Sequence, residues 1–438
     1  MSIPEGLVNI LPETARVGAE DRLVIGGCDL VELAREHGTP LYFFDEETLR
    51  HQCRQFVGEF GSRYPDVRVV YACKAYVNPA MVGLFREEGL GLDVVSAGEF
   101  MIARAGGFPL EAVYFHGNNK TPQELELAVS LGVGRIVVDG FHELELLEGI
   151  AAEQGRRVAI LLRLSPGIDP HTHAKTTTGI IDSKFGFPIA TGQAEEAVWA
   201  ALKRPHLDLV GLHCHLGSPI FELEPYAQAL EVLLEFIQYL EAMYHFQLKE
   251  LSPGGGFAIQ YVPETPAPKI SEYAETITSV LKGWLGSRDG PRLVIEPGRS
   301  IVGRAGVALY TVGASKDVPG VRKYVSLDGG MGDNIRQAIY GSRYVAMVAN
   351  RVSAPPEEKV TLAGKYCESG DVLIQDITMP RLKAGDLIAI PASGAYCLSM
   401  ASNYNASLRP PILLLKDGRA RVIRRRETFE DLMRCDVW

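Results

Sequence analysis

The sequence has no excess of basic residues. Lysine and arginine account for 44 of its 438 residues and aspartate and glutamate for 54, so the formal net charge is −10 at pH 7. No basic face or arm stands out, whereas nucleic-acid-binding proteins carry a basic patch or arm. We therefore expect no nucleic-acid partner. An anionic ligand would have to be bound by individually placed Arg, Lys or backbone N–H groups.

Long apolar runs and paired cysteines are also missing. No run approaches the roughly 20 apolar residues that cross a bilayer, so no membrane partner is expected. Residues 1–21 are acidic where a signal peptide has its basic segment. The cysteines at 28, 53, 73, 214, 367, 397 and 435 include no CxxC pair, which is typical of reduced thiols. These absences predict a cytoplasmic protein.

The sequence does contain a regular alternation of short apolar runs and amphipathic stretches. Thr121–Glu124 has the pattern of a helix capping box, and residues 226–243 have a helical period. Such runs are typical of strands buried on both faces of a parallel sheet. Eight of them, most followed by a helix, predict an α/β fold of the (β/α)8 TIM-barrel type, with a doubly wound open sheet as the alternative. The runs cover residues 68–74, 91–96, 112–117, 135–140, 158–165, 209–217, 250–256 and 292–298.

The chain after about residue 300 has a different pattern. Its apolar segments are short, separated by turn residues and rarely helical in period, which is typical of a β domain. Residues 41–45 (LYFFD) form a ninth strand candidate that the barrel does not need. We expect two domains, a cofactor-binding barrel over residues 40–298 and a mostly β domain formed by residues 1–39 and 299–438.

Polar residues stand where the predicted barrel strands end, which is the rim where barrels of this type place their active sites. Lys74 ends the first strand. Taken alone it fits a structural lysine at least as well as a lysine that forms a Schiff base with a carbonyl cofactor. The other motifs of the predicted rim are therefore needed to distinguish a structural lysine from a Schiff-base lysine.

A glycine run and an acidic residue point to a phosphate-bearing aromatic cofactor. Gly254–Gly256 directly follow a strand and would let backbone N–H groups surround a phosphate, although a simple tight turn is also possible. Ser218 can donate to the same phosphate, and His215 can lie against a flat ring or be a satisfied buried histidine. Glu296 can keep a pyridine nitrogen protonated, and Arg299 can bind an anion; a turn with a surface ion pair is the alternative.

Together these segments resemble the fold-type III, alanine-racemase-like decarboxylases that depend on pyridoxal 5'-phosphate (PLP), and within them the diaminopimelate-specific members. The resemblance covers nearly the whole chain. It implies PLP as cofactor, a barrel with a C-terminal β domain, and a homodimer whose active sites are shared between subunits. The motifs that carry it are YACKA, GLDVVSAGE, FHGNNK, RLSPGIDPHTH, TGIIDSKFG, GLHCHLGS, GGGF, EPGRSIVGRAG, CESGD and GAYCLSMASNYN.

The resemblance also implies roles for individual residues. Lys74 would carry the cofactor covalently, and Cys367, contributed by the partner subunit, would be the proton donor. The other cofactor-binding residues would be Asp93, Glu99, Arg163, His215, Ser218, Gly254, Gly255, Gly256, Glu296, Pro297, Gly298, Arg299 and Tyr396. The amino-acid substrate would be bound by Arg299, Arg336, Tyr340, Tyr396 and the partner's Glu368.

Some of these residues also fit plainer roles. Cys367 could be a small buried hydrophobe, and Tyr340 could belong to the core. His171 and His173 have the spacing of a metal pair, but no third ligand group is evident, so no metal is expected. We interpret residues 172–186 as a lid.

Two segments depart from the family's pattern. Phe257-Ala258 follow the glycine run where the family often has Leu-Gly or Phe-Gly, and DGGMGDNIRQAIY (328–340) stands where it often has DAGMNDLIRPALY. Arg336 and Tyr340 keep their spacing, so the departures bear on local packing.

The choice of reaction and substrate depends on charge. Racemases of this fold are expected to have an arginine where this chain has Glu296, which favours decarboxylation. Arg299, Arg336 and Tyr340 favour a substrate with a second α-carboxylate, so we expect conversion of meso-2,6-diaminopimelate to L-lysine and CO2, the last step of lysine biosynthesis. A decarboxylase of ornithine or arginine would need an acidic group there. A non-catalytic PLP-binding relative is disfavoured, because the lysine, the glycine run and the CES and GAY motifs are all present.

Overall fold

The computed structural model describes residues 3–170, 172, 176–180 and 182–438. His171 and His173 therefore lie outside the described residues. Contacts divide the chain into two compact units. The barrel unit comprises Cys53–Ala258 and Ala267–Gly298, and the β unit comprises Met1–Gln52, Ile259–Pro266 and Arg299–Trp438. Each is described here by itself.

The barrel unit contains a closed ring of eight parallel strands. Around the ring the order is β9, β11, β12, β13, β5, β6, β7 and β8, and β8 pairs again with β9. The predicted (β/α)8 barrel is confirmed, and each of the eight apolar runs overlaps one of its strands. These are β5 (Val67–Ala72), β6 (Gly91–Val94), β7 (Val113–Phe115), β8 (Arg135–Val138), β9 (Val158–Ser165), β11 (Leu207–His213), β12 (Glu250–Gly254) and β13 (Arg292–Ile295).

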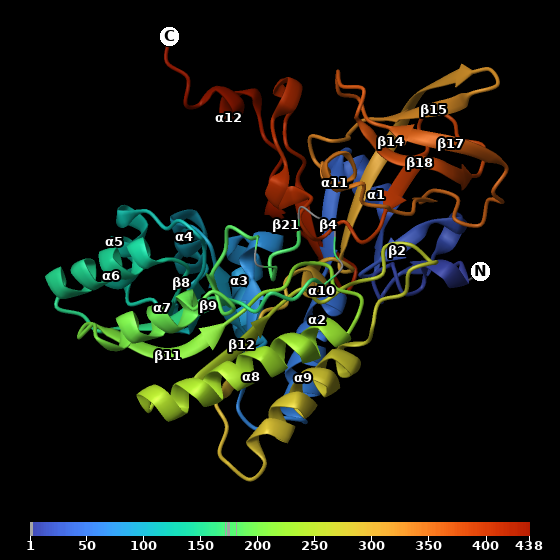
Figure 1. The fold of residues 1–438 in the computed structure, drawn as a ribbon. Helices are drawn as coiled ribbons and strands as arrows, with labels where there is room; N and C mark the ends of the chain where they lie inside the picture. The colour runs from blue at the N-terminus through green and yellow to red at the C-terminus, as the bar shows by residue number, and fades with distance from the viewer. Residues whose placement is uncertain (1–2, 171, 173–175, 181) are drawn as a thin grey trace. The chain divides into compact units, whose positions relative to one another are not determined.

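Helices follow the strands and lie outside them, as the cyan, green and yellow ribbons of Figure 1 show. The capping box predicted at Thr121 is present and begins α5, where Pro122 occupies the first turn and Gly132 ends the helix with a left-handed backbone. The helices of the unit are α3 (Pro79–Glu87), α4 (Ala97–Ala105), α5 (Pro122–Leu131), α6 (Phe141–Glu153), α7 (Gln193–Leu202), α8 (Glu224–Tyr244) and α9 (Ile270–Leu285), together with most of α2 (Glu46–Gly61).

The inside of the barrel is packed and its N-terminal end is closed by an ion-pair network. Six strands contribute one buried residue each to a central cluster that includes Val70, Leu161 and Val294. At the start of β12, Glu250 is 3 % exposed and accepts hydrogen bonds from Tyr114 at 3.0 Å and from Arg135 Nη2 at 2.7 Å. The barrel is therefore a core and not a pore, so a ligand has access only at the rim where the strands end.

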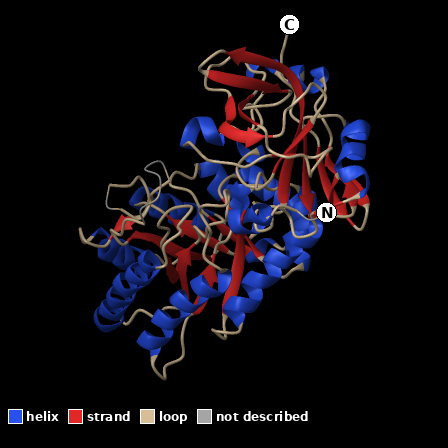
Figure 2. Ribbon diagram, turned by 90° about the vertical axis from the view of Figure 1, so that its right-hand side faces the viewer, coloured by secondary structure: helices blue, strands red, loops and turns tan. Residues whose placement is uncertain are grey.

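The β unit is built on a nine-stranded sheet with the path β18, β17, β15, β14, β4, β20, β21. Figure 2 shows these strands in red, with the short helices of the unit in blue. The strands are β4 (Leu41–Asp45), β14 (Gly306–Val318), β15 (Arg322–Leu327), β17 (Glu358–Ala363), β18 (Val372–Met379), β20 (Ile412–Lys416) and β21 (Arg419–Arg424). Additional pairs involve β16 (Met347–Val348) and β19 (Leu387–Ile390), and β1 (Arg16–Val17), β2 (Leu23–Ile25) and β3 (Cys28–Asp29) form a small separate sheet.

The strand at residues 41–45 lies in this sheet. It pairs antiparallel with β14 and parallel with β20, and Phe43 is fully buried in a core cluster with Leu309 and Leu413. From the sequence we placed these residues in the barrel domain, but both neighbours that complete the hydrogen bonds of β4 come from beyond residue 299. The predicted limits of the two folding domains stay a prediction.

Two further observations concern the chain as a whole. Among the described residues, no helix combines the length and the apolar composition needed to span a bilayer. No disulfide links the seven cysteines, all of which lie in the described residues.

Candidate active site

The rim of the barrel gathers the predicted cofactor-binding residues from successive strand ends. Lys74 lies in a short 3-10 helix (Cys73–Ala75) after β5 and is exposed there, where a ligand can reach it. Asp93 is on β6, Arg163 on β9, His215 in the loop after β11, and Glu296 follows β13. Asp93, Arg163 and Glu296 are each less than 10 % exposed. The strands thus bring together residues that are up to about 220 positions apart in the chain.

Glu296 is the best-connected acid of the rim. Ser252 donates a hydrogen bond to Oε1 at 2.8 Å, and His213 Nε2 lies 3.1 Å from Oε2. Burial on its own raises the pKa of this carboxyl, but the His213 and His116 rings and the two hydrogen bonds outweigh it and hold the pKa well below its usual range. Glu296 is therefore an ionised carboxylate at neutral pH.

Next to Glu296 lie two buried polar atoms that have no hydrogen-bond partner among the described residues, Oδ1 of Asp93 and Nε2 of His116. The His116 nitrogen is 3.6 Å from Glu296 and 3.8 Å from Asp93. Burial lowers the pKa of His116 well below its ordinary value, so this ring is neutral. Since buried polar groups are normally paired, the two unpaired atoms indicate room for a polar ligand.

Burial also raises the pKa of Asp93 and that of Glu99, the latter to about 7, against the opposing effect of the Lys74 ammonium. Glu99 lies in the first turn of α4, where its carboxylate accepts a 2.7 Å hydrogen bond from the backbone N–H of Val95. The acids around Lys74 therefore do not all carry a charge at neutral pH, which avoids placing three negative charges close together in a buried site.

The glycine run lies where β12 and β13 come into close contact. A Cβ on Gly255 would lie 2.1 Å from the carbonyl oxygen of Glu296, and one on Gly254 would lie 2.5 Å from that of Cys214. Gly254 and Gly256 have φ of +79° and +103°, which also favours glycine. His215 is tied to this loop, because the Gly255 N–H donates to its Nδ1 at 3.2 Å.

The protonation of His215 suits contact with a flat ring. Burial and the nearby Lys74 and Arg163 cations lower the pKa of His215 well below its ordinary value. The ring is neutral, accepts a hydrogen bond at Nδ1 and therefore carries its proton on Nε2. Ser218, three residues on, follows in the same loop.

The remaining predicted rim residues help to shape the site. Arg163 Cζ lies 4.2 Å from the centroid of the Phe185 ring, and Asp139, 3.7 Å from the Arg163 guanidinium, accepts a hydrogen bond from Gly186 N–H at 2.8 Å. Pro297 accepts a 3.1 Å hydrogen bond from Ala72 N–H. A Cβ on Gly298 would lie 3.0 Å from that of Ala72, so the turn after β13 packs directly behind the strand that leads to Lys74.

The segment interpreted as a lid contacts the rim where it is described. Thr178 and Gly179 N–H donate to the carbonyl of Leu216 at 2.8 and 3.0 Å, and the Thr178 hydroxyl donates to that of His215 at 2.6 Å. These bonds join the segment to the His215 loop. Its motion stays a prediction.

These residues fit PLP. Lys74 supplies an amine for the aldehyde, the glycine run and Ser218 supply a phosphate seat, the neutral His215 supplies a ring contact, and the ionised Glu296 with its unpaired neighbours supplies a polar end for a pyridine nitrogen. His116, His213 and Glu296 also bring ligand atoms within 4.8 Å of one another. The sequence pattern did not indicate this grouping, and the expectation of no metal stays a prediction.

The β unit contains a second cluster, in which two buried arginines lie among tyrosines. Arg299 Nη1 donates to Tyr261 OH at 2.8 Å, and its Cζ lies 4.8 Å from the centroid of the Tyr396 ring. Arg336 Cζ lies 5.4 Å from the same ring and 5.6 Å from that of Tyr340. The predicted substrate-binding residues Arg299, Arg336, Tyr340 and Tyr396 are therefore brought together within this unit.

Arg336 is 5 % exposed and has no acidic partner within 4 Å among the described residues. It donates to Tyr344 OH at 3.0 Å and to Ser342 Oγ at 3.3 Å. A buried guanidinium that meets only neutral groups has a charge that an anionic ligand can pair with.

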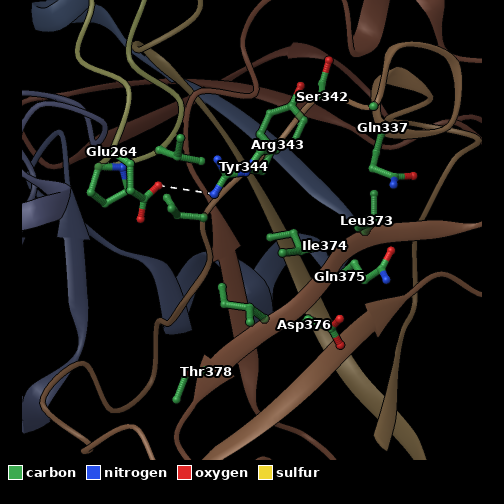
Figure 3. A pocket seen from close by; sticks show the side chains of 15 residues that line it. Glu264, Gln337, Ser342, Arg343, Tyr344, Leu373, Ile374, Gln375, Asp376 and Thr378 are labelled. Atoms are coloured by element: carbon green, nitrogen blue, oxygen red, sulfur yellow. Dashed lines mark hydrogen bonds and ion pairs between the residues drawn. The ribbon is translucent and has the colours of Figure 1, made fainter. Parts of the chain in front are cut away.

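Ser342 and Tyr344, the two partners of Arg336, line a cavity of about 550 Å³ in the β unit, whereas Arg336 itself does not line it. Figure 3 shows Ser342 and Tyr344 on its wall, with the Arg343–Glu264 ion pair on one side and residues of β18 on the other. The sequence pattern did not indicate this cavity.

Cys367 and Glu368 lie in the exposed loop between β17 and β18. The loop is held by Asp371, whose carboxylate accepts from Tyr366 N–H at 2.8 Å and from Met331 N–H at 2.6 Å, while Cys367 N–H donates to Asn405 at 2.9 Å. Both side chains are exposed, so Cys367 is not the buried hydrophobe that the sequence left open.

Several residues of the two clusters were not identified from the sequence. Tyr261 and Tyr344 are isolated tyrosines in irregular segments, and Ser252 precedes the glycine run. The predicted site includes His215 of the GLHCHLGS motif but not the first histidine of that motif, His213. Its position as the last residue of a strand, facing the same rim as Glu296, is a signal that could have identified it.

Comparison with known proteins places these observations in a family. The sequence profile described as the pyridoxal-binding domain of pyridoxal-dependent decarboxylases matches residues 46–303. Diaminopimelate decarboxylase of Bacillus subtilis is 45% identical over 97% of both chains, and that of Mycobacterium tuberculosis is 39% identical over 98% of both. The crystal structure of the M. jannaschii diaminopimelate decarboxylase in complex with L-lysine matches with a TM-score of 0.92, at 33% identity and 98% coverage of both chains.

The closed barrel, the rim lysine and the matched profile define a pyridoxal-dependent decarboxylase with a fold-type III barrel. Within this class, the chain belongs to the diaminopimelate decarboxylase family.

Proposed function

We propose that this protein decarboxylates meso-2,6-diaminopimelate to L-lysine and CO2, the last step of lysine biosynthesis, with PLP bound by the barrel unit. The observation that carries the choice of substrate is Arg336. Arg336 is buried in the β unit next to Arg299. Among the described residues, no carboxylate pairs with the Arg336 guanidinium. The distal α-carboxylate of diaminopimelate would supply that charge. Ornithine and arginine have only a cation at that end.

The chemistry divides between the cofactor and the chain. When bound, PLP takes up the electron pair that is left as the bond between Cα and the carboxylate breaks. Lys74 Nζ would hold the cofactor and yield it to the substrate amine. Glu296 would hold a proton on the ring nitrogen, and its low pKa keeps it charged for that task. Cys367 Sγ would then donate the proton that replaces CO2 at Cα.

We further propose that the active protein is a cytoplasmic homodimer in which Cys367 and Glu368 act in the site of the partner subunit. The exposure of both side chains on a loop fixed by Asp371 supports this assignment. The absence of disulfides among the seven cysteines is in keeping with a reducing compartment.

The test is CO2 release from meso-, LL- and DD-diaminopimelate, lysine, ornithine and arginine by the purified PLP enzyme. We expect activity on meso-diaminopimelate. Activity on ornithine or arginine alone would contradict the proposal. A visible absorbance that disappears in Lys74→Ala would identify the residue that carries the cofactor.

Arg336→Lys then tests the substrate assignment. Lysine keeps the charge but cannot form the two parallel hydrogen bonds of a guanidinium, so KM for meso-diaminopimelate should rise roughly tenfold or more. Arg343→Lys is the matched control, because Arg343 is close in sequence but exposed and paired with Glu264. Equal KM values for the two variants would refute the assignment of Arg336.

A further inference from the structure

Asp333 is a buried acid of the β unit for which the proposed mechanism has no use. It is 2 % exposed. The hydroxyl of Tyr42 donates to its Oδ1 at 2.9 Å, the hydroxyl of Tyr310 donates to the same oxygen, and Gly330 N–H donates to Oδ2 at 3.1 Å. A buried carboxylate is costly unless its oxygens are hydrogen-bonded, so these donors define where Asp333 can lie.

The two tyrosines belong to the rigid centre of the sheet. Tyr42 is on β4 and Tyr310 on the neighbouring strand β14, and their hydroxyls are 3.0 Å apart. Both are almost completely buried. Gly329 makes the close approach possible, because a Cβ there would lie 2.3 Å from the Tyr310 ring and 2.7 Å from Asp333.

Asp333 lies three residues before Arg336, the first residue of α11 (Arg336–Tyr340). The N–H groups of Asp333 and Asn334 donate to the carbonyl of Gly330 at 3.1 and 2.9 Å, and the Asn334 side chain accepts from Arg336 N–H at 3.4 Å. The turn from Gly330 to Arg336 is thus closed by its own hydrogen bonds. The Asp333 carboxylate attaches the turn to Tyr42 and Tyr310 of the sheet. The same turn is also held by the Met331 N–H bond to Asp371 and by the Ser402 N–H bond to the Gly332 carbonyl.

Arg336 depends on that attachment. Its guanidinium is buried and already held by Tyr344 and Ser342, so little freedom is left in the side chain to correct a shift of the backbone. A displacement of under an ångström at the start of α11 would misalign a bidentate contact, because such contacts require an accurate geometry.

We propose that Asp333, held by the hydroxyls of Tyr42 and Tyr310, is a positioning residue that fixes the start of α11 and so aims the Arg336 guanidinium at the distal carboxylate of the substrate. The inference rests on the proposed function, since it presupposes that Arg336 binds this carboxylate. Burial raises the pKa of Asp333 to about 6, and at neutral pH it accepts all three donors as a carboxylate.

The experiment compares ligands that do and do not carry the distal carboxylate. In Asp333→Asn, one of the two carboxylate acceptors becomes an NH2 donor, which then faces either the two tyrosine hydroxyls or the Gly330 N–H. We expect KM for meso-diaminopimelate and the inhibition constant of L-lysine, which keeps that carboxylate, to rise together by about tenfold. The inhibition constant of cadaverine, which lacks it, and the visible spectrum of the bound cofactor should not change. kcat should fall by less than about threefold.

Tyr310→Phe provides a milder variant in case Asp333→Asn folds poorly. Tyr310→Phe removes one hydrogen-bond donor without adding a group. KM for meso-diaminopimelate and the inhibition constant of L-lysine should therefore rise by about two- to fivefold. Asp386→Asn is the matched control, since Asp386 is a fully buried acid of the same unit that is paired with Arg351. Asp386→Asn should lower Tm without changing KM for meso-diaminopimelate or the inhibition constants of L-lysine and cadaverine.

Two outcomes would overturn the inference. One is a lower Tm in Asp333→Asn and Tyr310→Phe with no change for diaminopimelate or lysine. The other is an equal rise in the inhibition constant of cadaverine, which would indicate a purely structural role.

The variants should also be combined with Arg336→Lys. If Asp333 acts through Arg336, its effect on KM should be largely lost in that background, and additive effects would contradict it. If Arg336→Lys alone leaves KM unchanged, Arg336 does not bind the distal carboxylate. The proposed substrate contact is then wrong, and so is the inference that rests on it.

Discussion

At the scale of single residues, the gathering of Lys74 and Glu296 at the barrel rim could be predicted and their supporting contacts could not. Lys74 and Glu296 were found because each ends an apolar run, and a barrel brings all such ends to one rim. His213 and Ser252, which hold Glu296, were not. Their contribution depends on hydrogen bonds between residues 83 and 44 positions apart, and a local pattern does not encode such distances.

Glu99 provides a prediction at this scale, because its pKa is raised to about 7. The folded protein keeps a proton between about pH 4.5 and 7 that the unfolded chain releases, so stability must fall as pH rises through this interval. Glu99→Gln removes the titration and keeps an acceptor for Val95 N–H. The Tm of the variant apoprotein relative to wild type should therefore increase by a few degrees between pH 5 and pH 8, for an effect on the order of 2 kcal/mol. A Tm difference that is the same at both pH values would contradict the shift.

At the scale of elements, the barrel strands could be predicted and the pairing of the strands in the β unit could not. The eight runs are continuous and apolar because both faces of each strand are buried. Strand β21 (Arg419–Arg424) has no buried residue, and half of it is arginine. The sequence pattern at residues 421–425 marks a short segment of the β domain there but does not indicate its partner β20. β4 was recognised as a strand, but only its partners β14 and β20 determine which unit it joins.

The loop between β12 and α9 provides the prediction at this scale. Gly255→Ala would place a Cβ 2.1 Å from the Glu296 carbonyl, so the ends of β12 and β13 would have to separate. We expect a loss of PLP affinity of at least tenfold, measured by cofactor titration, together with a lower Tm. Gly283→Ala on α9 is the matched control, because nothing lies within 4 Å of its Cβ position. There the same substitution should leave PLP affinity unchanged and stabilise the helix by about 0.5–1 kcal/mol.

At the scale of the whole molecule, the remaining question is which subunit supplies Cys367. Lys74 belongs to the barrel unit and Cys367 to the β unit, and Cys367 is exposed in the described chain. If sites are shared across a two-fold axis, a Lys74→Ala subunit and a Cys367→Ala subunit complement each other. One site of their heterodimer then carries both substitutions, and the other carries neither.

This arrangement predicts the activity of a mixture. Each variant alone should be nearly inactive. After an equimolar mixture has dissociated and reassociated at random, half of the dimers are heterodimers, and each has one intact site of two. CO2 release should therefore recover to about a quarter of the wild-type value. A site built from a single subunit would carry one of the two substitutions in every molecule, so no activity would return. Mixing Lys74→Ala with Lys74→Arg is the control, because neither subunit can then supply the missing lysine.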